Sequence, residues 1–179
     1  MNPLLISIPE ELFAGAESLS FSGKVDFPSL VQDASTYRFT DPVEWNVAVT
    51  NTGDALLVSG TVKGRALTAC ARCLEDASYD FEGEVEGYFL IPGSDRELTD
   101  EEKSEYGVLG EDRTIDLEPL LQAALVLEFP YTPLCDEDCK GLCPSCGADL
   151  NKETCTCSVD DDTDDSNPFS VLKNYRFDD

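Results

Sequence analysis

The sequence predicts an α+β protein built mainly from an antiparallel sheet with a long hairpin, one packed core helix and a small C-terminal zinc-knuckle segment. Three observations lead to this prediction. Apolar and polar residues alternate through much of the first two thirds of the chain, which is typical of half-buried strands. One later stretch carries apolar residues at helical spacing. Six cysteines then fall between residues 135 and 157.

Length and composition limit the class of protein. The chain has 179 residues, of which 41% are hydrophobic, and this suits one compact domain with extensions. No apolar run approaches the about 18 residues that a membrane span requires, and the amino-terminal residues lack the basic patch of a secretory signal. We therefore expect a cytoplasmic protein with no membrane association. In a reducing compartment its eight cysteines should be thiols or metal ligands rather than disulfides.

The charge of the chain excludes several functions. There are 37 acidic residues against 12 basic ones, with a net charge of -25 and no histidine. Proteins that bind nucleic acid directly neutralise phosphates with Lys and Arg, so we expect no direct nucleic-acid binding. Without histidine, a Ser-His-Asp relay or a histidine base is impossible, and we expect no enzymatic activity. The acidic surface is either simply solvated or attracts a basic partner protein.

Two early segments have the period-two pattern of strands. Apolar residues occupy alternate positions in residues 19–27 and again in residues 43–49. The second segment is followed by Asn51-Thr52-Gly53-Asp54, a composition that favours a turn. We expect two strands here, with a reversal after the second.

A long hairpin is the clearest predicted element. Residues 56–66 and residues 79–89 each carry one apolar face and one polar face. Folding the two runs together about Arg72 and Cys73 aligns the apolar faces. The sequence Cys70-Ala71-Arg72-Cys73 should therefore form the hairpin tip.

The same register makes a prediction about charge. It places Lys63 near Glu82 and Arg65 near Asp80, and opposite charges across an antiparallel pair are stabilising. The second strand carries more acidic residues than the first has basic ones, so acids should remain exposed on its polar face. The residues that we expect to bind a basic partner are Asp80, Glu82, Glu84 and Glu86.

The remaining chain divides into a helix, a cysteine-rich segment and a tail. Residues 116–128 have apolar residues at helical spacing, Asp116 can cap the helix, and Pro130 ends it. We place a β-rich domain at residues 1–132, a zinc-binding segment at residues 133–158, and an acidic linker with the tail at residues 159–179.

Cys143-Pro144-Ser145-Cys146-Gly147 is the most specific motif. Two thiolates separated by two residues can bind one tetrahedral zinc ion (Zn²⁺), and Gly147 can take the positive φ that closes the turn. Two further ligands come either from Cys155 and Cys157 or from Cys135 and Cys139. We favour the first pair, because the residues after Gly147 let the chain double back.

The pair at the hairpin tip has three interpretations. Cys70 and Cys73 could join Cys135 and Cys139 in a second all-thiolate metal site, act as a redox pair, or belong to a structural turn. Arg72 could lower the pKa of a neighbouring thiol. A thioredoxin-type pair, however, lies at the start of a helix, and this pair lies between two predicted strands.

Four segments together resemble the YceD family, the large ribosomal RNA subunit accumulation proteins. These are Cys70–Glu75, Pro133–Cys135, Cys139–Asn151 and Asn167–Leu172. The resemblance implies a bacterial or plastid factor that large-subunit ribosomal RNA needs in order to accumulate. It also implies a gene neighbour that encodes a small basic ribosomal protein. Family members that keep the hairpin pair but lack the tail cysteines favour a tail site that stands alone.

Resemblance and charge combine into one expectation. We expect a ribosome biogenesis factor that supports the synthesis, processing or stability of large-subunit ribosomal RNA by binding a basic ribosomal or assembly protein. The alternative is a thiol-disulfide or metal-handling protein that uses Cys70 and Cys73. The sequence gives no indication of the oligomeric state.

Overall fold

A computed structural model describes residues 4–13, 17–92 and 106–157 of the chain. The predicted linker and tail at residues 159–179 lie outside the described residues. The chain forms two compact units, Met1–Cys139 and Lys140–Asp179. Residues 133–139, which we assigned to the cysteine-rich segment, are grouped with the first unit.

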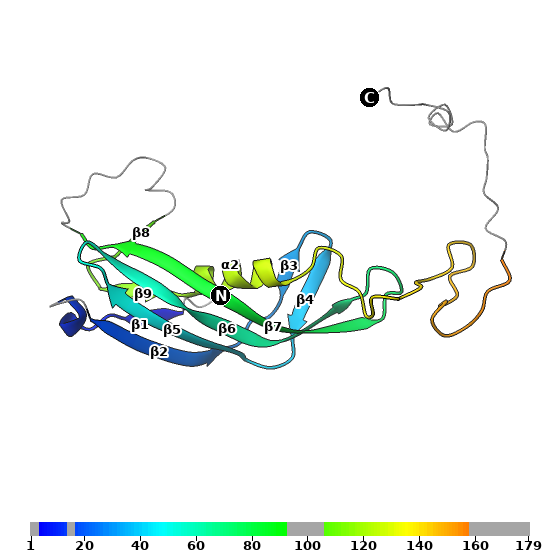
Figure 1. The fold of residues 1–179 in the computed structure, drawn as a ribbon, viewed down its shortest axis with the longest axis horizontal. Helices are drawn as coiled ribbons and strands as arrows, with labels where there is room; N and C mark the ends of the chain where they lie inside the picture. Colours follow the sequence, from blue (N-terminus) through cyan, green and yellow to red (C-terminus); the bar gives the residue numbers. More distant parts are fainter. Residues whose placement is uncertain (1–3, 14–16, 93–105, 158–179) are drawn as a thin grey trace, which may run out of the picture. The chain divides into compact units, whose positions relative to one another are not determined.

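The first unit contains nearly all the regular structure (Figure 1). Its elements in chain order are β1 (Leu5–Ser7), η1 (Glu10–Phe13), β2 (Ser18–Val25), β3 (Leu30–Gln32), β4 (Ser35–Phe39), β5 (Val43–Asn51), β6 (Ala55–Ala69), β7 (Asp76–Leu90), β8 (Gly107–Val108), β9 (Thr114–Asp116) and α2 (Glu118–Glu128).

One large sheet dominates this unit. β2, β5, β6 and β7 lie in that order, β4 pairs with the far end of β6 and carries β3, and β8 pairs with the end of β7. Every pairing is antiparallel except that of β7 with β8. β1 and β9 form a separate two-stranded sheet. The predicted α+β class, mainly antiparallel sheet with one α-helix in the described part of the chain, is confirmed.

The predicted hairpin is formed by β6 and β7. Its register runs without a break from Ala55 opposite Leu90 to Ala69 opposite Asp76. It places Lys63 opposite Glu82 and Arg65 opposite Asp80, as the sequence predicted. The turn between the strands spans residues 70–75, so Cys70 and Cys73 lie at the tip.

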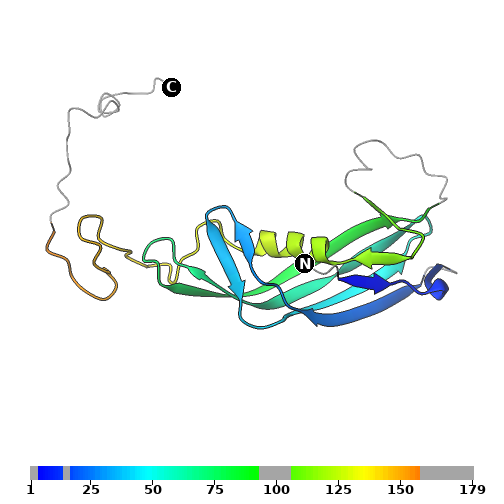
Figure 2. The same ribbon diagram turned by 180° about the vertical axis from the view of Figure 1, so that it is seen from behind.

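Helix α2 lies along one face of the sheet (Figures 1 and 2). Its buried residues are Leu121, Ala124 and Leu125, and the helix packs mainly against β7, with further contacts to β6 and β3. Two glycines of β7 allow the close approach. A Cβ at Gly83 would lie 3.1 Å from the carbonyl oxygen of Ala124, and one at Gly87 would lie 2.6 Å from Leu120 Cδ1.

The helix begins two residues later than predicted. Residues 116–128 were expected, but α2 starts at Glu118 because Asp116 is the last residue of β9 and pairs with Leu5. The Asp116 carboxylate still accepts the N–H of Glu118 at 3.0 Å and that of Leu4 at 3.1 Å. Asp116 therefore joins the strand to the start of the helix. None of the described helices is long and apolar enough to cross a membrane.

The second unit has little regular structure in its described part, residues 140–157. An isolated bridge joins Leu142 to Asp149, and Leu150 donates its N–H to the carbonyl of Gly141 at 3.0 Å. The N–H of Lys140 is bound by the side-chain oxygen of Asn151 at 2.7 Å. Turns rather than an apolar core define this segment.

Gly60 of β6 offers a test of the sheet geometry. A Cβ at this residue would lie 2.0 Å from the carbonyl oxygen of Asn46 and 2.6 Å from Val47 Cα, and backbone atoms cannot give way as a flexible side chain can. We expect Gly60→Ala to lower the free energy of unfolding by about 2–3 kcal/mol. Ser59→Ala, at the neighbouring exposed position, should change it by less than about 0.5 kcal/mol. Urea denaturation measures both, and equal effects would contradict the prediction.

Candidate metal centres and the acidic strand

The predicted knuckle forms a tight turn in the second unit. Gly147 takes a φ of +75° and donates its N–H to the carbonyl of Cys143 at 2.8 Å. Cys143 in turn donates its N–H to the carbonyl of Ala148 at 2.8 Å. These two bonds turn the chain so that Cys143 and Cys146 face the same point.

Four cysteines meet at that point, and we name them the tail cluster: Cys143, Cys146, Cys155 and Cys157. Their sulfurs all lie within 4.8 Å of one another, with 3.4 Å between Cys143 and Cys155 and 3.5 Å between Cys146 and Cys155. A zinc ion about 2.3 Å from each of four sulfurs would hold every sulfur pair about 3.8 Å apart. The spacing therefore fits a tetrahedral thiophilic metal ion, and this is the ligand set that the sequence analysis favoured.

The other four cysteines meet in the first unit, and we name them the tip cluster: Cys70, Cys73, Cys135 and Cys139. Cys70 lies 3.8 Å from Cys139 and Cys73 lies 3.5 Å from Cys135, sulfur to sulfur. The hairpin tip supplies one pair and the segment after α2 supplies the other. Cys135 and Cys139 thus join the hairpin pair and do not complete the knuckle.

Each cluster contains one thiol that ionises easily. Burial raises the pKa of Cys70, but the N–H groups of Cys135, Cys73 and Arg72 point at its sulfur and lower the pKa to about 6. In the tail cluster, the N–H groups of Cys146 and Ser145 likewise lower the pKa of Cys143 to about 6. Each cluster thus holds a thiolate near neutral pH.

Their neighbours behave in the opposite way. The thiols of Cys73, Cys139 and Cys70 surround Cys135, and together with burial they raise its pKa to about 12. The N–H of Cys157 lowers the pKa of Cys155. The thiols of Cys157, Cys143 and Cys146 outweigh this effect and raise the pKa to about 12. Four adjacent thiols cannot all ionise unless a cation offsets their charge.

The predicted partner-binding residues lie on the exposed face of β7, and we name them the acidic row: Asp80, Glu82, Glu84 and Glu86. Arg65 binds the Asp80 carboxylate through two bonds of 2.6 and 3.1 Å and lowers the pKa of that carboxyl group. No ion pair within the described ranges holds the three glutamates.

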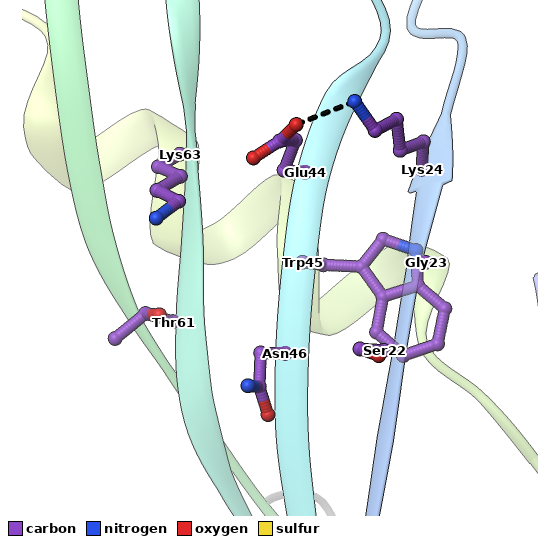
Figure 3. Close-up of a pocket in the computed structure, with 8 residues that line it drawn as sticks. All are labelled: Ser22, Gly23, Lys24, Glu44, Trp45, Asn46, Thr61 and Lys63. Atoms are coloured by element: carbon purple, nitrogen blue, oxygen red, sulfur yellow. Dashed lines mark ion pairs between the residues drawn. The ribbon is translucent and has the colours of Figure 1, made fainter.

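The same face of the sheet has a shallow depression toward β2 (Figure 3). Its lining residues are Ser22, Gly23, Lys24, Glu44, Trp45, Asn46, Thr61 and Lys63. Lys24 and Glu44 form an ion pair of 2.5 Å, which raises the pKa of the lysine and lowers that of the glutamate. Two lysines, Lys24 and Lys63, accompany a single acid, Glu44, in this depression, so the excess of acidic residues on this face lies on β7.

The pKa pattern predicts how metal binding depends on pH. At about pH 7 at least two thiols of each cluster carry protons, because the pKa of Cys135 and Cys155 is about 12 and that of Cys73 and Cys157 is raised. A bound metal ion must displace these protons. We expect the affinity for Zn²⁺ at each cluster to rise about 100-fold from about pH 7 to about pH 8 and to fall on acidification. Competition with a chelator of known proton affinity measures this, and pH-independent binding would contradict it.

Comparisons with known proteins agree with the resemblance noted in the sequence. An uncharacterized protein of Mycobacterium tuberculosis is 36% identical over 111 residues, which are 62% of this chain and 53% of that protein. The large ribosomal RNA subunit accumulation protein YCED homolog 1, chloroplastic, of Arabidopsis thaliana is 26% identical over 177 residues, 80% of this chain and 52% of that one.

A third relative and the family model complete the comparison. The uncharacterized protein YlbN of Bacillus subtilis is 28% identical over 134 residues, 74% of this chain and 75% of YlbN. The chain spans about half the length of the mycobacterial relatives. No solved structure matches. The model of the large ribosomal RNA subunit accumulation protein family matches residues 58–175, and the chain therefore belongs to the YceD family.

Proposed function

We propose that this protein is a non-enzymatic, cytoplasmic ribosome biogenesis factor that supports the synthesis, processing or stability of large-subunit ribosomal RNA. It acts by holding a basic ribosomal or assembly protein on the acidic row. The observation that carries the proposal is an exposed row of acids, on one strand face, in a member of a family named for ribosomal RNA accumulation.

The geometry of the acidic row suits a basic partner. Alternate residues of a strand lie about 6.6–6.8 Å apart, which is less than the Debye length of about 8–10 Å at physiological salt. The fields of Glu82, Glu84 and Glu86 therefore reinforce one another. With a net charge of -25, the chain repels phosphates and attracts Lys-rich and Arg-rich surfaces.

Zinc at the tail cluster is part of the proposal. Four cysteine sulfurs at tetrahedral spacing form a closed, structural type of site, and thiolates select soft ions. The described part of the second unit has turns and an isolated bridge in place of an apolar core. Binding energy from Zn²⁺ would then stabilise this unit as it does other small zinc domains.

Burial argues against the thiol-disulfide alternative. Redox catalysis needs a thiolate that a substrate disulfide can reach. Cys70 is 0% exposed, although its pKa is low, and Cys73 is 5% exposed. The pair also lies in a turn between two strands rather than at the start of a helix.

Neutralising the acidic row tests the proposed partner. We expect the variant Glu82→Gln, Glu84→Gln, Glu86→Gln to lose at least about 10-fold in recovery of cross-linked basic ribosomal or assembly proteins, identified by mass spectrometry after cross-linking in cells. In a pull-down with purified protein, the difference between the variant and the wild type should shrink as salt rises, because screening weakens the same interactions in the wild type.

The matched control removes the same number of charges elsewhere. Glu11→Gln, Glu17→Gln, Asp26→Asn changes three exposed acids of the first unit and should retain recovery. Equal losses in both variants would contradict the proposal, because they would show that the net charge of the chain, and not the acidic row, determines recovery of the partner. Wild-type protein that recovered ribosomal RNA with no basic protein present would refute the proposal.

Metal analysis tests zinc at the tail cluster. The double variant Cys143→Ser, Cys146→Ser should contain one zinc ion fewer per chain than the wild type, because two of four ligands are lost. Limited proteolysis should then cut residues 140–157 faster, while Met1–Cys139 stays resistant. Ser145→Ala is the control, since its exposed side chain is no ligand, and it should keep its zinc. An unchanged zinc content in the double variant would contradict the prediction.

A further inference from the structure

We infer that the tip cluster is a second zinc site, which fastens the hairpin tip to the segment that follows α2, and that Arg72 positions its ligands. This inference does not depend on the proposed ribosomal role. It concerns a site inside the first unit, with ligands that lie 62 to 69 residues apart in the sequence. Donor chemistry selects the ion, since four sulfurs at a tetrahedral site favour zinc.

The sulfur distances distinguish a metal site from disulfides. A disulfide joins its sulfurs at about 2.05 Å, whereas Cys70 and Cys139 are 3.8 Å apart and Cys73 and Cys135 are 3.5 Å apart. None of the eight cysteines, all of which lie in the described residues, forms a disulfide. These separations approach the edge of about 3.8 Å expected for four sulfurs around zinc.

Simple apolar packing does not explain the cluster. Buried free cysteines usually behave as small apolar side chains, and Cys70, Cys73 and Cys139 are indeed buried. Here, however, backbone N–H groups are directed at a sulfur, and the N–H of Arg72 donates to Cys70 Sγ at 3.4 Å. Such donors stabilise a thiolate. Four sulfurs that all lie within 4.8 Å of one another, one of them accepting a backbone N–H, form a ligand set for a metal ion.

Hydrogen bonds hold the two ligand pairs together without help from a metal. Ala71 donates its N–H to the carbonyl of Pro133 at 2.8 Å. The hydroxyl of Tyr79 donates to the carbonyl of Leu134 at 2.8 Å and accepts the N–H of Leu134 at 2.7 Å. These bonds lie next to Cys70 and Cys135 in the sequence, so the site is organised before an ion binds.

Arg72 completes this arrangement from the other side. Its Nη1 donates to the carbonyl of Cys139 at 2.8 Å, with a longer contact of 3.4 Å to the carbonyl of Glu137. The guanidinium thus fixes the loop that carries Cys139. Four thiolates with one divalent ion leave about two negative charges, and the charge of Arg72 offsets part of them. Arg72 is a positioning residue, because it acts through the ligands.

Zinc stoichiometry of the full chain tests the inference. Protein prepared without chelators should contain two zinc ions per chain. The double variant Cys70→Ser, Cys73→Ser and the single variant Cys135→Ser should each lose one, and Cys143→Ser, Cys146→Ser should lose the other. Cys135 is exposed, so its replacement should leave the fold intact and separates ligand loss from misfolding. A wild-type content of one zinc, lost in the tail variant and kept in Cys135→Ser, would overturn the inference.

Cobalt titration provides a second measurement. Co²⁺ added to metal-free, reduced chain should give sulfur-to-cobalt charge-transfer absorbance that saturates at two equivalents, and at one equivalent in either cluster variant. Saturation of the wild type at one equivalent would overturn the second site whatever the ribosomal experiments show.

The role of Arg72 is measured in the Cys143→Ser, Cys146→Ser background, where only the tip site remains. Arg72→Ala should weaken zinc binding there by about 10–100-fold, the usual effect of losing a group that orients metal ligands. Arg38→Ala removes an exposed arginine that pairs with Asp76 near the same end of the hairpin and should leave the affinity unchanged. Equal affinities with and without Arg72 would refute its positioning role.

Discussion

The register of the β6–β7 hairpin is the constraint on which the other features of this structure depend. One register holds from Ala55 opposite Leu90 to Ala69 opposite Asp76. It directs the acids of β7 to solvent, sets Gly83 and Gly87 beneath α2, and leaves Cys70 and Cys73 in the turn. A slip of one residue would move every side chain of β7 to the other face, carrying the glutamates into the core.

The route of the chain after α2 brings the second ligand pair to the hairpin tip. Phe129 stacks on Tyr37 of β4 with ring centroids 4.1 Å apart, and the Tyr37 hydroxyl donates to the carbonyl of Pro130 at 2.7 Å. Gln32 of β3 donates its side-chain N–H to the carbonyl of Phe129 at 3.1 Å. The short β3–β4 hairpin therefore guides the exit from the helix toward the tip, where Cys135 and Cys139 meet Cys70 and Cys73.

The sequence was informative where local periodicity determines structure. Alternating apolar residues predicted β2, β5 and the long hairpin, and the helical spacing predicted all of α2 with two extra residues at its start. β3 and β4 were missed because they are short and joined through Asp33, which has a φ of +53°. β1 and β9 were missed because their pairing joins distant parts of the chain. The partners of Cys70 and Cys73 could be named only as one option, since spacing along the chain says nothing of contacts over 60 residues apart.

With metal bound at both clusters the protein would still be strongly acidic, as its exposed acidic surface is without metal. Each site of four thiolates with one divalent ion keeps about two negative charges. Filling both clusters would therefore make the net charge of -25 more negative by about four. Zinc would therefore serve the structure and would not make the chain a better ligand for RNA. Under the function proposed above, the effect on ribosomal RNA is exerted through a positively charged partner, and the acidic row of β7, held outward by the hairpin register, is an exposed surface that suits such a partner.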